Sequence, residues 1–543
     1  MDFNQKSGEY KPEQPQLFKF RMSGVVGSLA SAIMISRILG LVREIVLARF
    51  FGAGFSTDAF YVAYRIPNLL RDLFAEGALS SAFIPTFVRR LTRDGKERAW
   101  LLANRVINAL LMILGIFTLV FFFGAKAFVY LLASGYAGDP EKFDLTVQMI
   151  RIMSPFLLCV SLASVGMGML NAFGKFFIPA MASSAFNICC ILAGIFLSPI
   201  MPQFGLYPII SMAIGALVGG ASQVFIMVPS AYSMGFRYRL AFDFADPGVR
   251  KIARLMLPAV IGLSATQINI TVDTQIASTY GDGPVSWLNY GFRLMQLPVG
   301  VFGIAIATST MAAVAHHAAR NARDKLHKTV DSSLRLAACL TFPAMIGLII
   351  FRNEIVCLLY ERGSFLPSDT VQTGKVVLFY AFGLFSYSAV KILVPAFYAL
   401  NDTRTPIRMS FITVAAKIVL NFILIVPLGF LGLALSTTLA SWLNFGLLMN
   451  HLRRQNVPRC YGTGIGVYTR IAFASFAMGL LALLVFHGSG LFFSGHGFFS
   501  LVVKLGSAIL ISLASLIPLL KILKVEEGNV MLRMVGSLIG KVR

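Results

Sequence analysis

The chain has 543 residues, of which 57% are hydrophobic and only 13% are charged, and its mean hydropathy is +0.76. This composition excludes an ordinary soluble enzyme and indicates an all-α polytopic membrane protein. A net charge of +23 would suggest nucleic acid as a partner in a soluble chain, but here Lys and Arg gather in alternate loops between apolar segments. We therefore expect membrane lipids as partners and no nucleic acid.

The first stretch, residues 1–21, is polar and contains Pro12 and Pro15. It lacks the apolar core of a signal peptide and is predicted to be a cytoplasmic tail. The apolar runs that follow are long enough to cross a bilayer, which takes about 20 residues, and they predict fourteen transmembrane helices. These cover residues 22–50, 57–92, 100–133, 143–172, 178–199, 206–233, 251–280, 285–315, 329–351, 373–398, 405–426, 430–453, 466–487 and 499–522.

The loops between these helices differ in charge on the two sides of the membrane. Basic clusters such as Arg89/Arg90/Arg93 and Arg453/Arg454/Arg459 follow even-numbered helices, whereas opposite loops such as TYGDGPVS and VPLGFLG are short and carry no Lys or Arg. Because loops rich in Lys and Arg stay in the cytoplasm, both termini are predicted to be cytoplasmic.

The chain repeats itself at a period of about 228 residues. LNAFGKFFIPAM, which contains Ala172, is matched by YALNDTRTPIRM, which contains Ala399, and ARFFGAG (48–54) is matched by ASTYGDG (277–283). Six helices form each unit, so the interface of two like lobes would lie near the middle, where transporters place a substrate site. The predicted parts are an N-terminal tail (1–21), an N-lobe of helices 1–6 (22–235), a C-lobe of helices 7–12 (236–455), helices 13 and 14 (456–524) and a cytoplasmic C-terminal tail (525–543).

The stretch from Ser36 to Pro85 carries charges inside two apolar helices. A charge at the centre of the bilayer costs about 2.5–3.5 kcal/mol, so these side chains must face water or one another. Snorkelling from helix ends is the alternative. We predict a polar cavity inside the bundle, with Asp58 near the outer helix ends as the partner of a gating arginine. The charged residues concerned are Arg37, Arg43, Asp58, Arg71 and Glu76.

A lone arginine, Arg293, lies in the predicted helix 285–315 between aromatic and apolar residues, five positions before Pro298. The planar guanidinium grips phosphate oxygens in a bidentate way that an ammonium group cannot match. Arginines that converge from both lobes therefore predict a site for a pyrophosphate or another multiply charged anion. The six cysteines have no metal-ligand spacing, so we expect no disulfide framework, metal site or cofactor.

Several segments resemble the MurJ (MviN) family of lipid II flippases, part of the multidrug/oligosaccharidyl-lipid/polysaccharide exporter superfamily. They read SRxLGxxRE from Ser36, FGAGxxTDAF from Phe51, SWxxYxxRL from Ser286, LYERGSF from Leu359 and ALNDTRTP from Ala399. The resemblance runs from about residue 22 to the end and implies fourteen helices around a cationic central cavity. It also implies that helices 13 and 14 line a groove for the polyprenyl tail.

Carried over by position, the resemblance implies substrate-binding roles for the arginines and one serine, and charge-partner roles for two acids. The substrate-binding residues are Arg37, Arg43, Arg71, Arg293 and Ser286, and the acids are Asp58 and Glu76. The chain departs from the family at Phe292 and Gln296, where acids often flank the arginine. Arg293 is therefore expected to lack a local counter-charge and to be freer for phosphate.

The predicted function is that of a lipid II flippase of the bacterial plasma membrane, working by alternating access as a monomer that can contact the cell-wall synthesis machinery. The first alternative is an exporter of another polyprenyl-linked oligosaccharide or of a drug, from the same superfamily. The second is a membrane phosphatase, which would need a nucleophile or clustered His with acids near the arginines, and none of the six histidines lies near them in sequence.

Three further polar residues lie within apolar helices: Asp273, Lys417 and Asn421. At 1.5 Å per residue, Asp273 and Asn421 lie at a similar depth, and Lys417 is one turn from Asn421 on the same face. Some family members resemble sodium binders at these helices, but Ile425 stands where they have a second acid. We predict that the Lys417 ammonium occupies the place of a cation beside Asp273. The alternative is that Lys417 snorkels outward.

Overall fold

The computed structural model describes residues 22–71, 79–320, 322–454, 465–492 and 497–528. In these residues every regular element is a helix. The first part of the chain contains α1 (Met22–Phe51), α2 (Phe55–Leu70), α3 (Ser80–Phe123), α4 (Ala125–Leu132), α5 (Pro140–Met153), α6 (Phe156–Ala172), α7 (Phe177–Leu192) and α8 (Ile210–Ser233). The second contains α9 (Pro247–Ala277), α10 (Pro284–Pro298), α11 (Ile304–Ala319), α12 (Arg323–Ile350), α13 (Arg352–Tyr360), α14 (Pro367–Ala381), α15 (Leu384–Ala399), α16 (Arg404–Leu428) and α17 (Leu431–Arg454), followed by α18 (Ile465–Phe492) and α19 (Phe498–Ile522).

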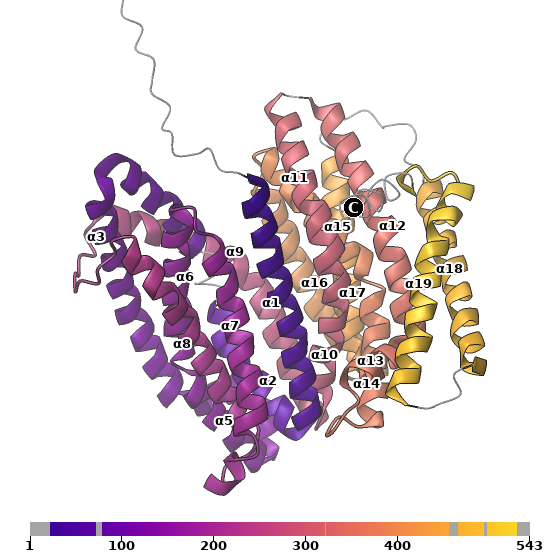
Figure 1. Cartoon of the computed structure of the whole chain (residues 1–543), viewed down its shortest axis with the longest axis horizontal. Helices are drawn as coiled ribbons and strands as arrows, with labels where there is room; N and C mark the ends of the chain where they lie inside the picture. Colours follow the sequence, from indigo (N-terminus) through magenta and orange to yellow (C-terminus); the bar gives the residue numbers. More distant parts are fainter. Residues whose placement is uncertain (1–21, 72–78, 321, 455–464, 493–496, 529–543) are drawn as a thin grey trace, which may run out of the picture.

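The helices form two lobes that stand side by side (Figure 1). In the N-lobe, α7 packs against α1 and α8, and α6 packs against α3 and α8. In the C-lobe, α15 packs against α11, α12 and α17, and α16 packs against α17. The lobes approach each other at the end where α2, α10, α13 and α14 lie, and they are spread apart at the other end (Figure 1).

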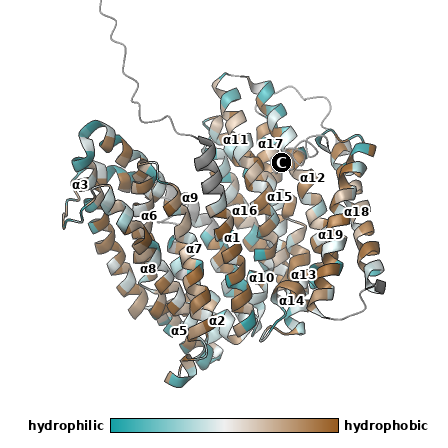
Figure 2. Cartoon of the chain, viewed as in Figure 1, coloured by the Kyte–Doolittle hydropathy of each residue, from teal (hydrophilic) through white to brown (hydrophobic). Residues whose placement is uncertain are grey.

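The outer surface of the bundle is that of a membrane protein. Hydrophobic residues predominate in the middle of most helices, and hydrophilic residues are more frequent toward their ends (Figure 2). Large apolar side chains are widely exposed, among them Val426, 84% exposed. Ten helices of the described chain are long and apolar enough to span a membrane, or eleven if the bent pair α14 and α15 counts as one span. The all-α membrane class is thus established, while the count of fourteen remains a prediction.

The helix boundaries follow the spacing of the internal repeat. Pro140 begins α5 and Pro367 begins α14, and α6 ends at Ala172 where α15 ends at Ala399. One pair of matched glycines also agrees, because Gly52 (φ 68°) and Gly281 (φ 80°) both have the positive φ that favours glycine. The repeat found in the sequence therefore corresponds to the same succession of helices in each lobe.

One predicted break falls where it was expected. We expected separate helices over 57–92 and 100–133, and α3 (Ser80–Phe123) consists of two helical parts that meet at a kink at Gly95 (φ 83°). The loop predicted between them is much shorter than expected, because one glycine in the left-handed region is sufficient to turn the chain.

The segment that joins the lobes is fastened to α3. The buried Asn104 side chain donates to the Arg237 carbonyl and accepts from the Arg239 amide, and Asn108 donates to the carbonyls of Arg239 and Ala241. At the end of this segment Asp246 caps α9. Burial opposes the charge of Asp246, but donation from two backbone amides and ion pairs with Arg90 and Arg105 lower the pKa of its carboxyl. The connection therefore belongs structurally to the N-lobe.

The last two helices lie on the far side of the C-lobe (Figure 1), where α18 packs against α12 and α19 packs against α18. Gly479 of α18 allows this close approach, because a Cβ there would overlap the Ile346 side chain. Beyond α19, the buried Glu527 carboxylate lies 2.8 Å from Nε of Arg335 on α12. Helices α18 and α19 are therefore packed as an integral part of the C-lobe.

Candidate functional site

A buried carboxylate joins the two lobes at the end where they meet. Asp58 of α2 is fully buried and accepts hydrogen bonds from the backbone amides of Gly283 (2.7 Å) and Ser286 (2.8 Å) and from the Ser286 hydroxyl (2.5 Å). Gly283 and Ser286 belong to the first turn of α10, so a side chain of the N-lobe caps a helix of the C-lobe. Free amides and the helix dipole both favour an anion at this position.

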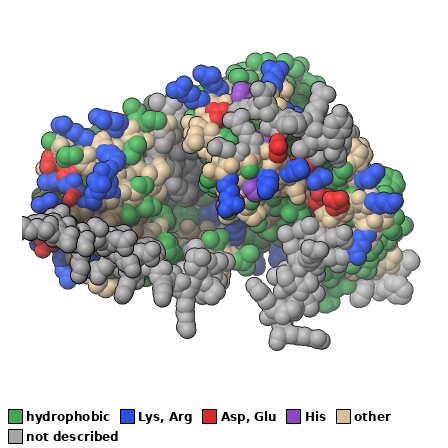
Figure 3. Space-filling view, turned by 90° about the horizontal axis from the view of Figure 1, so that it is seen from above, with side chains coloured by type: hydrophobic (Ala, Val, Ile, Leu, Met, Phe, Trp, Pro, Cys, Tyr) green, Lys and Arg blue, Asp and Glu red, His purple; other side chains and the backbone are tan. Residues whose placement is uncertain are grey.

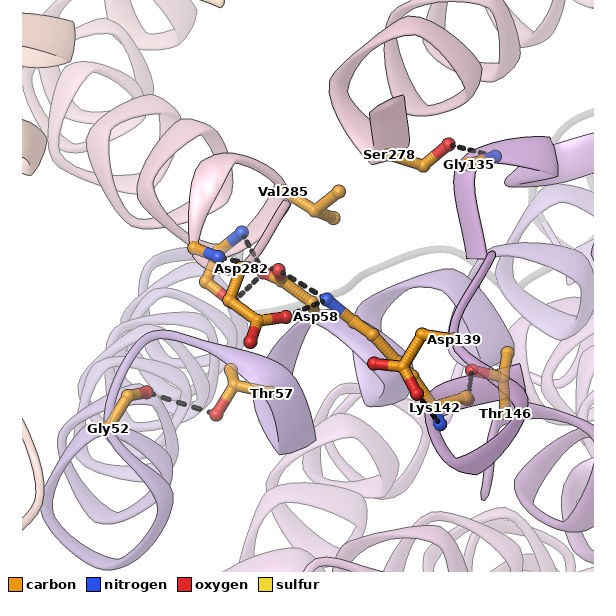
Figure 4. A network of polar contacts seen from close by, with 12 residues as sticks. Gly52, Thr57, Asp58, Gly135, Asp139, Lys142, Thr146, Ser278, Asp282 and Val285 are labelled. Atoms are coloured by element: carbon orange, nitrogen blue, oxygen red, sulfur yellow. Dashed lines mark hydrogen bonds and ion pairs between the residues drawn. The ribbon is translucent and has the colours of Figure 1, made fainter. Parts of the chain in front are cut away.

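A lysine completes the network. The Lys142 ammonium, from α5, lies 3.1 Å from one Asp58 oxygen and 2.6 Å from Asp282, which comes directly before the α10 cap (Figure 4). The same ammonium lies 4.4 Å from the centroid of the Tyr136 ring. Lys142 is itself buried, so one cation of the N-lobe is shared between a carboxylate of its own lobe and one of the other.

Further contacts extend this seam between the lobes. The Ser364 amide of the C-lobe donates to the Arg49 carbonyl (2.9 Å), and the Tyr290 hydroxyl donates to the Gly52 carbonyl (3.2 Å). On the other flank Gln275 exchanges two hydrogen bonds with Ser134, at 3.1 Å and 2.6 Å. We call these contacts and the Asp58 network the outer seam.

One expectation about this region needs correction, and another stays a prediction. Asp58 was expected to gate with an arginine, but its cationic partner is Lys142. Ser286 was expected to bind substrate; its side chain is fully buried in the seam and its hydroxyl donates to Asp58, so contact with substrate would require the seam to open. The reason is the same for both residues: the start of α10 approaches α2 so closely that these polar groups satisfy one another.

A second cluster lies where α1, α2, α7 and α10 face a small cavity of about 60 Å³. Glu44 of α1 is buried; its carboxylate lies 2.6 Å from Nη2 of Arg43 and 3.4 Å from Nε of Arg293, and it accepts from the Tyr61 hydroxyl at 2.8 Å. Arg293 comes from the C-lobe, and its side chain is 54% exposed. One carboxylate thus stands between an arginine of each lobe, and we call this group the arginine cluster.

The other predicted arginines lie around this cluster. Arg37 of α1 reaches the C-lobe, since a Cβ on Gly300 would overlap its guanidinium. Gly300 lies in a π-helical turn after Pro298 (Val299–Gly303). Arg71 directly follows α2 and is close enough to Tyr64, a residue of the small cavity, to interact with it electrostatically. Glu76 lies outside the described residues.

Sequence reasoning missed three residues of these sites: Glu44, Lys142 and Asp282. Glu44 was visible as the last residue of the SRxLGxxRE segment, and Asp282 as part of the repeat segment ASTYGDG. Neither signal shows which cation each acid would meet. Arg293 was expected to lack a counter-charge, yet Glu44 supplies one from the other lobe.

The C-lobe holds a third polar group. The Asp273 carboxylate of α9 lies 2.5 Å from the Lys417 ammonium and accepts from the Asn421 side-chain amide at 2.8 Å, both on α16. Asn421 in turn accepts from the Ser436 hydroxyl of α17. The structure thus brings together the three residues that were predicted to meet, and Lys417 points inward and is buried.

Comparison with known proteins places these features in a family. The family model described as lipid II flippase MurJ matches residues 47–509. A probable lipid II flippase MurJ of Vibrio cholerae is 35% identical over 84% of this chain and 87% of its own length, and the lipid II flippase MurJ of Burkholderia cenocepacia is 32% identical over 78% and 82%.

Solved structures agree with this result. A lipid II flippase MurJ in an inward closed conformation is 26% identical and matches with a TM-score of 0.76. The match covers 91% of this chain and 99% of that structure. A multidrug transporter of the MATE family, 14% identical, matches with a TM-score of 0.65 over 79% of this chain and 99% of its own length. At that identity the second likeness concerns the fold alone.

We predict that Asp58→Asn opens the outer seam. An asparagine accepts less strongly from the α10 amides and leaves the buried Lys142 ammonium paired with the exposed Asp282. Removal of one partner of a fully buried ion pair costs about 3–5 kcal/mol, which is an upper bound here. The measurement is the rate at which an impermeant maleimide labels a cysteine placed at the buried Val285, in purified protein whose native cysteines are replaced. Labelling should accelerate several-fold.

The matched control is Asp144→Asn, which changes an exposed carboxylate on the same helix as Lys142. It should leave labelling of the cysteine at position 285 unchanged. Asp58→Asn combined with Lys142→Met should label more slowly than Asp58→Asn alone, because no buried charge is left without its partner. Equal labelling of wild type and Asp58→Asn would contradict the assignment of Asp58 as the residue that holds the seam.

Proposed function

The chain belongs to the lipid II flippase MurJ family, and we propose that it moves lipid II across the bacterial inner membrane by alternating access. In this proposal the pyrophosphate of lipid II binds at the arginine cluster. It is a transporter and not an enzyme. The observation that carries the proposal is that Arg43 and Arg293, one from each lobe, meet at one buried carboxylate.

The chemistry of the arginine cluster suits a pyrophosphate. Arg43 and Arg293 share one counter-ion, Glu44, so the cluster keeps a net positive charge. Arg293 is more than half exposed, and its guanidinium can turn from Glu44 to an entering phosphate without first being uncovered. Because a guanidinium donates two parallel hydrogen bonds to phosphate oxygens, the two arginines would replace much of the water around the pyrophosphate.

The outer seam would close the path to the outer leaflet. It contains Asp282, Gly283 and Ser286, which lie in the loop TYGDGPVS, predicted to face outward by its lack of Lys and Arg. With both termini cytoplasmic, the open end between the lobes would face the cytoplasm; seen from that end, the molecule is recessed between them (Figure 3). Release of lipid II outward would then require the Asp58 network to break and the lobes to close at the cytoplasmic end.

The remaining parts have roles that follow from their position. Helices α18 and α19 lie outside the repeat at the edge of the C-lobe, and we propose that they guide the polyprenyl tail through the bilayer while the head group passes between the lobes. Both lobes that contribute to the arginine cluster belong to one polypeptide chain. We therefore propose that the monomer is sufficient for transport. Contact with the cell-wall synthesis machinery would serve delivery of the product.

Coupling would involve Asp273. Lys417 occupies the side of this carboxylate where a bound cation would otherwise be needed, and the neighbouring Asn421 amide also donates to it. A fixed ammonium neutralises Asp273 at all times, so we propose that the protein needs no sodium and responds to membrane potential or protons.

We expect the arginines to act through their shape as well as their charge. Arg37→Lys, Arg43→Lys and Arg293→Lys should each impair complementation of a depletion strain and weaken binding of undecaprenyl pyrophosphate by about tenfold, because lysine lacks the planar fork. Arg89→Lys, on the exposed face of α3, is the matched control and should behave as wild type. Full activity with lysine at all three cavity positions would show that bidentate binding is not used.

The Lys417–Asp273 pair is tested by a double-mutant cycle. Asp273→Asn leaves the buried Lys417 ammonium alone, and Lys417→Met leaves the partly buried Asp273 carboxylate alone. Each should lower thermal stability, by up to about 3–5 kcal/mol for the first, whereas the double variant should be milder than the worse single one. Transport in proteoliposomes should not depend on sodium. Additive losses, or transport that rises with sodium, would refute the role given to Lys417.

A further inference from the structure

A large cavity inside the C-lobe lies beside the arginine cluster. It measures about 360 Å³ and is lined by residues of α9, α10, α14, α15, α16 and α17, with Arg65 of α2 as the one N-lobe residue among them. Arg65 and Asn289 line both this cavity and the small cavity of the arginine cluster. A ligand held at the arginine cluster is therefore next to the entrance of the larger cavity.

The charges that line this cavity do not balance. Three cations, Arg65, Lys391 and Lys417, face it, and Asp273 is the one carboxylate in its described lining. Asp273 is already engaged by Lys417. The ion pairs in the described parts of the chain do not include Lys391. This lysine is half-buried on α15 and is repelled electrostatically by Arg37. A half-buried ammonium that faces other cations favours the entry of an anion.

The rest of the lining indicates what kind of anion this would be. Residues with side-chain amides and hydroxyls, including Asn289, Asn444, Ser410 and Thr413, line it together with the aromatic residues Phe292 and Tyr380. Such a surface offers hydrogen bonds to amide groups and apolar contact to short side chains. At about 30 Å³ for each water molecule in the liquid, the cavity has room for about a dozen waters. A single small ion such as chloride would leave most of this space unfilled.

Resting on the proposed function, we infer that this C-lobe cavity binds the carboxylate-bearing peptide of the lipid II head group, with the Lys391 ammonium as the partner of a peptide carboxylate. The disaccharide is less suited to provide this contact, because a neutral sugar gives Lys391 no counter-charge. The pyrophosphate would remain at the arginine cluster, so the two anionic parts of one head group would occupy adjoining cavities.

The test compares three lipids bound to the full-length protein in nanodiscs: undecaprenyl pyrophosphate, the same lipid with the disaccharide but no peptide and with the sugar carboxyl that bears the peptide capped as a neutral amide, and lipid II with its pentapeptide. Lys391→Gln should weaken binding of the pentapeptide lipid by about tenfold and leave the affinities for the other two unchanged. Lys391→Arg retains the charge and should preserve the preference for the pentapeptide lipid. Lys375→Gln, at an exposed position of α14, is the matched control.

Each other outcome has a defined meaning. If Lys391→Gln also weakens binding of the disaccharide lipid, the cavity binds the sugar. If it weakens binding of all three lipids, Lys391 belongs to the phosphate site. Either result overturns the inference, and so does unchanged binding of all three lipids. Arg293→Ala separates this inference from the proposed function, because it should weaken all three lipids alike. If Arg293→Ala has no effect on any of them, the proposed pyrophosphate site itself is wrong.

Discussion

One buried carboxylate, Asp58, holds the two lobes together at one end of the molecule. It is stable there because two backbone amides, a hydroxyl and an ammonium surround it, and because it caps a helix of the opposite lobe. The hydrogen-bond donors are fixed at the start of α10, so the lobes cannot slide past each other gradually. An intermediate position would leave buried polar groups without hydrogen-bond partners. The seam is therefore either formed or broken, and a transporter that rocks between two states needs a contact of this kind.

The arginine cluster depends on the same helix. Ser286 and Arg293 both belong to α10, seven residues apart, which is about 10 Å along a helix axis. A phosphate that draws Arg293 away from Glu44 would thus act on the helix whose first turn is held by Asp58. Glu44 links the arginines of the two lobes. If the head group binds at the arginine cluster, its binding and the opening of the seam would be connected through one helix, α10.

The sequence was most informative where a pattern is local. Apolar length predicted the helical membrane class, and the repeat, with Pro140 answering Pro367, predicted the matched helices of the two lobes. Arginines flanked by apolar residues predicted a polar interior because lipid cannot accept their charge. The partners of these charges could not be predicted, since Glu44 with Arg293 and Lys142 with Asp282 pair across the lobes. Lys417 and Asp273 were paired in advance because helix depth alone limits what each can reach.

The central claim is that this protein carries lipid II outward past the arginine cluster. The most direct measurement is the fraction of lipid II that is accessible at the outer face of the inner membrane. It is made in cells depleted of the wild-type protein and supplied with either wild type or a variant that carries both Arg43→Ala and Arg293→Ala. We expect lipid II to accumulate on the inner face in depleted cells and in cells with the variant, and wild type to restore the outer pool. Accumulation of lipid II on the outer face after depletion would contradict this claim.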